Sequence, residues 1–331
     1  MLYYKLNINR KINNKNMYKN SRDIYVNNRN EVLKNKIMIE KIKSFKIPPV
    51  WRDVVINPNS NKIIVTGYDI KGRKQYIYSN KHVENKSYEK FCELLNFGKH
   101  IPKIKRDVIK KLNGTKLTKD KLIALIIRII LICNFRIGTE TCRKNNNSYG
   151  ISTLIKKQIK LENNSTTIEF VGKKGVINKC KIEDKLVNSV IKTLYNARKS
   201  NEEVFKISAT KSVNFLDVNN FLKKYDPKIT TKDFRTWAVN TIFLKKLLND
   251  SISNKITNRK KLVRDTIKYV AEKLHHTTAV CKKKYLLNPL IDLYIDKPEK
   301  LKRYIVKRGT SNYEMEELTF IKYLKSYCKQ K

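Results

Sequence analysis

The chain is poor in the residues and motifs on which metal and nucleotide sites depend. Its 331 residues include four histidines, and none of the six cysteines belongs to a CxxC pair. A His/Cys cage for a metal ion is therefore not expected. The sequence also lacks a GxxxxGK[ST] segment, which argues against a P-loop ATPase. We expect neither a metal nor an organic cofactor.

Acidic residues are scarce. The chain has 29 Asp+Glu against 73 Lys+Arg, which leaves a net charge of +44. Self-repulsion of that size opposes the compact state, so the composition predicts a polyanionic partner. Nucleic acid is the first candidate and an anionic membrane surface the second. A basic protein that only coats DNA would explain the charge equally well.

Long hydrophobic runs are missing too. The most apolar segment, residues 121–135, is shorter than the ~20 residues of a membrane span, and Arg128 interrupts it. Its apolar residues recur at helical spacing, which predicts a buried core helix and no membrane association. The six scattered cysteines, with no secretory signal visible, predict reduced intracellular thiols.

The pattern along the chain predicts an α+β fold. Residues 1 to about 30 are polar and basic, which predicts a loosely ordered arm before a short helix that Pro48 and Pro49 stop. Alternating residues over 62–68 and 73–79 predict a hairpin. Further strands are expected over 152–161, 166–171 and 176–182, within otherwise helical sequence. We place an arm and helix at 1–45, a small β-rich domain at 46–86 and a larger, mainly helical domain with a small antiparallel sheet at 87–331.

The sequence predicts a helix that starts at Thr230 and carries Arg235 in its first turns. Thr230 and Asp233 have the spacing of a capping box, with Thr230 as the N-cap. A phosphate bound near this end would also meet the positive end of the helix dipole.

A histidine and a tyrosine nine residues apart, His276 and Tyr285, lie in cationic surroundings. A tyrosine with a pKa near ~10 is a poor nucleophile at neutral pH, unless cations stabilise the charge that develops during attack on a phosphodiester. Metal-free cleavage also needs a clamp on the nonbridging oxygens, which suits arginine, and an acid for the leaving oxygen, which suits lysine. The candidates are Arg136, Lys173, Arg235 and His276. Each also has an ordinary structural explanation, and Lys174 competes with Lys173.

The order of these five residues resembles that of the type IB DNA topoisomerases. Several segments carry the resemblance, which runs from about residue 45 to about 295: Ile47–Val54, Thr66–Asp69, Gly72–Tyr76, Arg136–Gly138, Asn147–Leu154, Phe170–Lys173, Lys232–Trp237 and Lys284–Tyr285. Only fifty positions separate Arg235 from Tyr285, which is similar to the compact enzymes of poxviruses, giant DNA viruses and some bacteria. Together with the Asn/Ile/Lys bias, this predicts a large DNA virus as the source.

The resemblance implies a fold, a reaction and the role of each residue. The larger domain would have the catalytic fold that tyrosine recombinases and type IB topoisomerases share. Tyr285 would form a 3′-phosphotyrosyl link to double-stranded DNA, with Arg136, Arg235 and His276 stabilising the transition state and Lys173 protonating the leaving 5′ oxygen. Swivelling of the free strand and resealing would then relax supercoils without ATP or metal. We expect a monomer, in a virion or viral factory in the host cytoplasm if the source is viral, and otherwise in the nucleus.

The resemblance also implies DNA contacts outside the cleavage site. Arg73, Gln75, Tyr76 and Tyr78 in the hairpin resemble residues that enter the major groove, although the two tyrosines could instead form an aromatic pair facing the core. Two residues that flank Arg235, Lys232 and Asn240, resemble contacts to the DNA backbone.

Some residues depart from the family pattern. Residues 139–142 replace the basic and tyrosyl residues with which poxvirus enzymes read a pyrimidine-rich target. His275 and Thr278 stand where relatives often have glycine and proline. A tyrosine recombinase is the nearest alternative enzyme, but recombinases usually carry histidine at the position of Lys232. Relaxation of a plasmid without paired target sites would separate the two activities.

Overall fold

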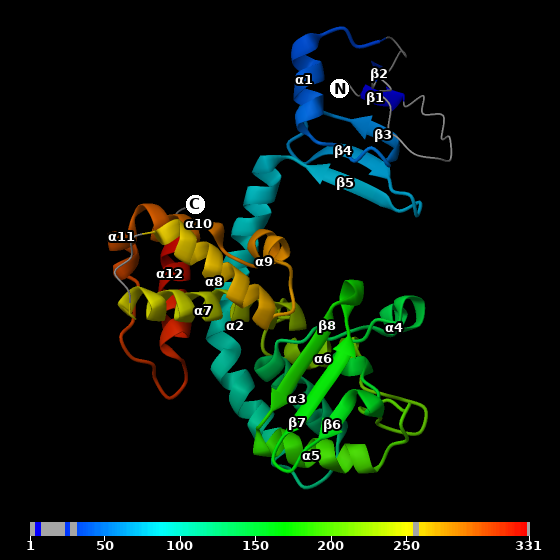
Figure 1. The fold of residues 1–331 in the computed structure, drawn as a ribbon, viewed down its shortest axis with the longest axis vertical. Coiled ribbons are helices and arrows are strands. Elements are labelled where there is room, and N and C mark those ends of the chain that lie inside the picture. The colour runs from blue at the N-terminus through cyan, green and yellow to red at the C-terminus, as the bar shows by residue number, and fades with distance from the viewer. Residues whose placement is uncertain (1–3, 8–23, 27–31, 254–257, 330–331) are drawn as a thin grey trace. The chain divides into compact units, whose positions relative to one another are not determined.

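The protein divides into two compact units, Met1–Lys90 and Phe91–Lys331. A computed structural model describes residues 4–7, 24–26, 32–253 and 258–329, and Figure 1 shows their helices and strands. The predicted arm lies mostly outside these residues. Within the described ranges, no helix combines the length and apolar character that crossing a membrane requires.

The described residues of the first unit form a five-stranded sheet, helix α1 and the first turns of α2. The strand order is β2-β1-β3-β4-β5, and each neighbouring pair is antiparallel. The bounds are β1 (Tyr4–Asn7), β2 (Ile24–Val26), α1 (Lys36–Ser44), β3 (Arg52–Ile56), β4 (Ile63–Tyr68) and β5 (Lys74–Tyr78). Ile42 of α1 is completely buried with apolar residues of β3 and β4. The hairpin and the short helix were predicted, whereas β1, β2 and β3 were not.

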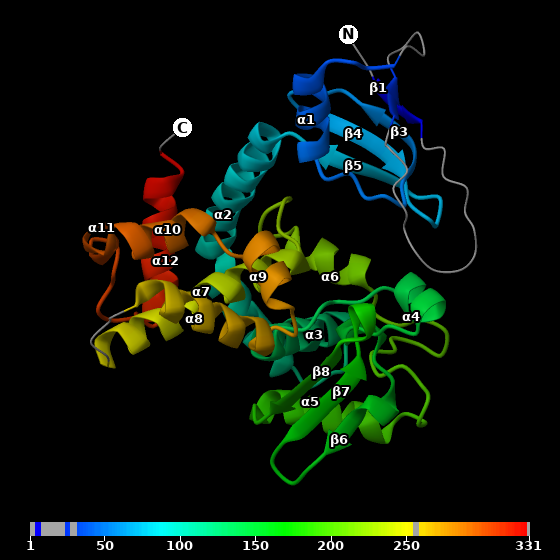
Figure 2. The ribbon, with the colours of Figure 1, turned by 45° about the horizontal axis from the view of Figure 1, so that its top comes forward.

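The second unit is mainly helical. Its helices are α2 (Asn80–Leu112), which begins before the division, α3 (Lys119–Cys133), α4 (Glu140–Asn146), α5 (Lys185–Asn196), α6 (Phe215–Leu222), α7 (Thr231–Ser253), α8 (Arg259–Lys273), α9 (Thr278–Lys284), α10 (Asn288–Asp296), α11 (Pro298–Lys302) and α12 (Met315–Tyr327). Helix α7 packs beside α8 and α12, as both views show (Figure 2). The predicted α+β fold class is confirmed.

The predicted core helix is α3. Thr118 caps its start by accepting from the Lys121 backbone N–H, and nine of its residues are buried. It ends at Asn134, which has a φ of 55° and adopts the left-handed conformation. Such a conformation ends a helix because the chain turns away from the helix axis. This turn delivers the next residues, including Arg136, to the region that forms the candidate site.

The small sheet of this unit contains β6 (Ile159–Leu161), β7 (Thr166–Val171) and β8 (Ile177–Ile182) in that order, all antiparallel. The predicted strand over 152–161 is confirmed only at its end, in β6, and the prediction was wrong for residues 152–158, which contain two 3₁₀ turns, Ile151–Thr153 and Lys156–Gln158. Ser152 does not pair with a strand, because its backbone N–H donates to the Ile137 carbonyl (2.8 Å). The alternating apolar residues of this segment therefore pack without a ladder.

Helix α7 begins at the predicted capping residues. The Asp233 carboxylate accepts from the Thr230 backbone N–H (2.8 Å) and from the Thr230 hydroxyl (3.0 Å). The helix is anchored by Trp237, whose indole N–H donates to Glu317 of α12 (3.1 Å). A Cβ on Gly98 of α2 would lie 2.5 Å from the Trp237 ring, so glycine is required at this contact. The start of α7, which carries Arg235, is thus fixed by its own capping residues and by two other helices, α2 and α12.

The expectation of reduced thiols was wrong for four of the six cysteines. Cys92 is bonded to Cys328 and Cys133 to Cys180. The sequence separations of 236 and 47 residues explain why spacing did not reveal these pairs. Cys142 is a free, exposed thiol and Cys281 a free, buried one.

Candidate active site

Arg136 follows α3 in a segment that is locked to a second loop. Its carbonyl accepts from the Ile151 backbone N–H (2.9 Å). Gly138 has a φ of +81°, and a Cβ there would lie 2.7 Å from Gly150 Cα. The two backbones touch, so each needs glycine. The Arg-Ile-Gly and Tyr-Gly-Ile motifs are therefore explained by one packing contact that fixes the main chain at Arg136.

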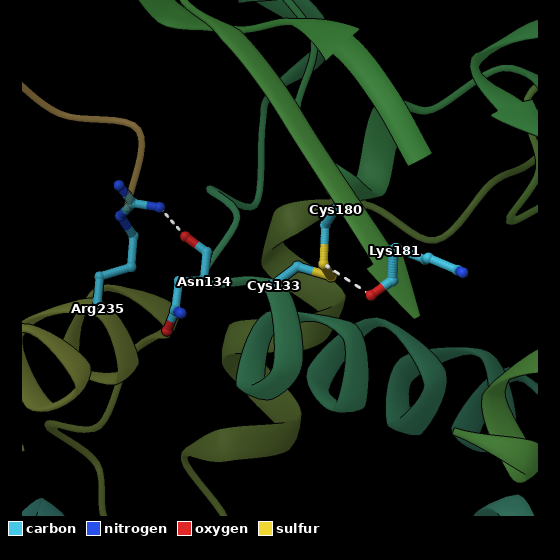
Figure 3. Close-up of a disulfide and its surroundings, with 5 residues drawn as sticks. All are labelled: Cys133, Asn134, Cys180, Lys181 and Arg235. Carbon is cyan, nitrogen blue, oxygen red and sulfur yellow. Dashed lines mark hydrogen bonds between the residues drawn. A yellow bond between two sulfur atoms is a disulfide. The ribbon is translucent and has the colours of Figure 1, made fainter. Parts of the chain in front are cut away.

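Arg235 is a buried cation held by main-chain carbonyls. Only 3% of the residue is exposed. One guanidinium nitrogen, Nη1, donates to the Asn134 carbonyl, and Nη2 donates to the Leu274 carbonyl (2.7 Å). Figure 3 shows the guanidinium reaching Asn134 directly after the Cys133–Cys180 disulfide. Arg235 thereby connects the ends of α3 and α8.

The electrostatics at Arg235 are unfavourable to its own charge. Burial, and then the charge of Arg136, lower the pKa of Arg235 from its ordinary value to about 10. Tyr285 acts in the opposite direction, through its charge interaction and through a hydrogen bond between the two side chains. In the described part of the chain no carboxylate bonds to this guanidinium. The cluster therefore has a deficit of negative charge, which a bound anion would relieve.

His276 lies between Arg235 and Tyr285. Its backbone N–H donates to the Ala271 carbonyl (2.8 Å), and its Nε2 contacts Arg235 Nη2. Because a guanidinium only donates, Nε2 accepts and the imidazole is neutral. Burial, followed by the charges of Arg235 and Arg136, lowers the pKa of His276 to about 3. Its Nδ1 is buried and lacks a hydrogen-bond partner among the described residues.

The residue before this histidine has an unusual backbone. His275 has a φ of +52°, in the left-handed region that favours glycine. The resemblance places glycine at this position in many relatives, and the backbone supplies the physical reason. The turn lets the chain leave α8 and present His276 before Thr277 caps α9 by accepting from the Val280 backbone N–H (3.3 Å).

Tyr285 directly follows α9 and faces the cationic cluster. Its ring stacks on the His276 ring, with 4.4 Å between the ring centroids and 23° between the planes. The Arg235 guanidinium carbon lies 6.0 Å from the centre of the Tyr285 ring. Arg136, Arg235, His276 and Tyr285, which are far apart in the sequence, thus converge at one place.

Lys173 lies outside this cluster of four. It is exposed in a 3₁₀ turn, Lys173–Gly175, between β7 and β8. Lys174, also exposed, has a φ of 65°. No described hydrogen bond or ion pair joins either lysine to the four clustered residues. The contacts therefore do not decide which of the two lysines is the acid.

The four candidate residues of the hairpin differ in their exposure and in their hydrogen-bond partners. Tyr76 and Tyr78 are 43% and 39% exposed, and their rings stack with centroids 6.0 Å apart. The alternative in which they face the core is therefore wrong. Gln75 alternates with them along β5, and its amide donates to Asp69 (2.9 Å). Arg73 also bonds to Asp69 (2.6 Å), and this contact is the first cause that lowers the pKa of the Asp69 carboxyl.

The two flanking residues of α7 also differ. Lys232 is exposed near the start of the helix. Asn240 is completely buried, and its side chain is hydrogen-bonded to the protein main chain. The sequence-based interpretation of Asn240 as a DNA contact therefore does not fit its environment.

The comparison with known proteins decides the family. The family described as Eukaryotic DNA topoisomerase I, catalytic core, matches residues 75–310, a range that contains all five candidate catalytic residues. DNA topoisomerase 1B of Acanthamoeba polyphaga mimivirus is 34% identical over 275 residues, which cover 79% of this chain and 81% of that protein. The chain belongs to the type IB DNA topoisomerases. It is thus an isomerase, and neither a recombinase nor a protein that only coats DNA.

Poxvirus relatives of this topoisomerase are more distant. DNA topoisomerase 1B of vaccinia virus (strain Copenhagen) is 27% identical over 269 residues, which cover 78% of this chain and 82% of that protein. DNA topoisomerase I of monkeypox virus has the same identity and coverage.

Sequence reasoning missed the groups that hold Arg235 in place. These are the carbonyls of Asn134 and Leu274, which belong to the main chain and leave no trace in residue type. The one available signal was position, because each lies at the end of a helix, where carbonyls lack partners within the helix.

Proposed function

We infer that Tyr285 is the nucleophile of this topoisomerase and that Arg136, Arg235 and His276 bind the phosphate that it attacks. The observation that carries this inference is the convergence of the phenol with a buried guanidinium. Two arginines and a neutral imidazole form a site that favours an anion, because none of the carboxylates that the structure describes is bonded to Arg235. A DNA phosphodiester supplies one, and arginine binds its oxygens through forked hydrogen bonds.

The reaction would exchange one phosphoester bond for another. The Tyr285 hydroxyl gives its proton to solvent water as its oxygen bonds to phosphorus. The bond to the 5′ oxygen breaks, and the enzyme becomes linked to the 3′ phosphate. We propose Lys173 as the donor that protonates the leaving oxygen, because it lies on the turn that follows the Phe-Val-Gly motif. After the free strand swivels, the 5′ hydroxyl attacks the phosphotyrosine and restores the DNA. Because the phosphotyrosine retains the bond energy, ATP is not needed.

The exposed hairpin residues are proposed as the DNA contacts of the first unit. Tyr76 and Tyr78 present two stacked rings to solvent, and tyrosines can contact bases or phosphates. Arg73 is available to phosphates while it remains bonded to Asp69. Gln75 can read an adenine edge, but this would require its bond to Asp69 to break. The exposed Lys232 is proposed to contact the backbone near the cleavage site.

The partner is therefore double-stranded DNA, and we propose that the enzyme acts as a monomer. The first unit would bind DNA and the second would cleave it. The viral relatives support a location in a virion or viral factory. Sedimentation of the protein with and without a short duplex tests the proposed stoichiometry.

The Tyr285→Phe variant tests the nucleophile. It should neither relax a supercoiled plasmid nor form covalent adducts, because the attacking oxygen is gone, yet it should still bind DNA. Tyr269→Phe removes the hydroxyl of a tyrosine that is 37% exposed on α8, and it should relax DNA like the parent. Both assays are run in EDTA without ATP. Normal relaxation by Tyr285→Phe would disprove the assignment.

A further inference from the structure

Asn240 uses its side chain to hold the main chain on both sides of Tyr285. The amide nitrogen donates to the Tyr285 carbonyl (2.9 Å) and to the Thr236 carbonyl of its own helix (2.7 Å). The amide oxygen accepts from the Leu287 backbone N–H (3.0 Å). Both amide hydrogens and the oxygen are thus engaged, and the residue is 0% exposed. A side chain in this state has no surface to offer a DNA phosphate.

The clamped segment is the short link between α9 and α10. On its amino-terminal side, the backbone N–H groups of Tyr285 and Leu286 both donate to the Cys281 carbonyl (3.1 Å each). On its carboxyl-terminal side, the Tyr285 carbonyl and the Leu287 N–H meet Asn240. Helix α9 therefore holds one end of the link and α7 holds the other.

Arg235 lies on the same helix as Asn240, ~7.5 Å earlier along the axis at 1.5 Å per residue. One rigid element thus carries both the guanidinium that contacts the tyrosine side chain and the amide that contacts the tyrosine main chain. The distance between nucleophile and phosphate clamp is therefore set through α7.

We propose that Asn240 is a positioning residue, which places Tyr285 for attack without contacting DNA. The proposal rests on the proposed role of Tyr285 as the nucleophile. A misplacement of about 1 Å can slow a reaction on the order of 10²-fold. Loss of the Asn240 hydrogen bonds to the main chain around Tyr285 should therefore lower the cleavage rate by about that factor and leave the affinity for DNA unchanged.

Three variants test the proposal. Asn240→Ala removes the whole clamp. Asn240→Asp has almost the same shape and keeps the acceptor for Leu287, but it loses the donor to the Tyr285 carbonyl. Thr241→Ala is the matched control, because the Thr241 side chain is also buried but bonds only to carbonyls of its own helix, those of Trp237 and Ala238.

Each variant is measured in three ways. Single-turnover cleavage of a duplex whose cut end cannot religate gives the chemical rate. Noncovalent binding is measured as DNA affinity at several salt concentrations, in proteins that also carry the Tyr285→Phe substitution. Thermal unfolding gives stability. Both Asn240 variants should cleave about 10²-fold more slowly with unchanged affinity and salt dependence, whereas Thr241→Ala should cleave like the parent.

Other results would overturn the proposal. A salt dependence shallower by about 0.9 in log–log slope would mean that Asn240 contacts a phosphate directly. If Thr241→Ala lost as much cleavage and as much stability as the Asn240 variants, Asn240 would contribute only to the stability of the fold. If Asn240→Ala does not fold, the nearly isosteric Asn240→Asp decides: parental cleavage by it refutes the clamp. Cleavage by Tyr285→Phe would instead show that Tyr285 is not the nucleophile, and the positioning proposal, which depends on that role, would also be refuted.

Discussion

The Arg235→Gln variant should separate what this buried guanidinium does to folding from what it does to DNA cleavage. Burial lowers the pKa of Arg235 from its ordinary value to about 10, and at ~1.4 kcal/mol per pKa unit this corresponds to roughly 3 kcal/mol against the folded state. Because the folded pKa lies below the unfolded one, the destabilisation is fully present below about pH 10. It disappears only as the pH rises toward the ordinary pKa of an arginine. Neutral pH therefore gives the full effect.

Removing the guanidinium also takes donors from the carbonyls of Asn134 and Leu274. An unsatisfied buried acceptor costs about 1–3 kcal/mol, and the glutamine amide can still donate to one of the two. The gain and the loss nearly cancel, so urea unfolding should give a free energy of unfolding within about 2 kcal/mol of the parent. Single-turnover cleavage should nevertheless fall on the order of 10²–10³-fold, as when one transition-state donor is removed.

DNA supplies the anion that the cluster lacks, so a duplex should raise the Tm of the parent more than that of Arg235→Gln. Arg106→Gln is the control, because it removes an exposed arginine of the same unit that bonds to Asn312. It should cleave like the parent. A loss of more than about 4 kcal/mol in Arg235→Gln would show that the guanidinium stabilises the fold, against the balance estimated above. Cleavage within about tenfold of the parent would show that it is not a transition-state clamp.

Five further variants test other parts of the site. Lys173→Ala should slow cleavage by about 10²-fold and Lys174→Ala should not. A DNA substrate with sulfur in place of the 5′ bridging oxygen should restore cleavage by Lys173→Ala, because the sulfur leaves without a proton. The opposite ranking of the two variants would make Lys174 the acid. The pKa of His276 lies at about 3, below the ordinary 6.5, so the unfolded chain binds more protons in that window and stability should fall as the pH drops through it. Thermal unfolding of His276→Gln should depend less on pH there, and an unchanged dependence would contradict this. Gly138→Ala combines a φ of +81° with a backbone atom 2.7 Å from the new Cβ, and should lower both Tm and cleavage. Gly175→Ala, with a φ of +74° but nothing within 4 Å, should lower only Tm, and by less; equal losses of Tm would refute the packing argument.

Several features could be predicted because their signals are local. The helical spacing of apolar residues predicted α3, and the capping residues predicted the start of α7. Alternating residues over 62–68 and 73–79 predicted the hairpin, and Gly72 between them has a φ of 70°. In each case the residues that carry the signal also form the element. Neither the pairing of β1 with β3 nor the two disulfides could be predicted, because their partners lie far apart in the sequence.

The sequence by itself determined the family, the fold class and the identity of the residues that could do the chemistry, because these depend on residue type and order. Only the tertiary structure decided which of them meet. It brings Arg235, His276 and Tyr285 together through carbonyls that belong to the main chain. It turns Asn240 toward the segment that carries Tyr285, because the packing of α7 settles which way each of its polar side chains faces. Residue type carries no record of that packing.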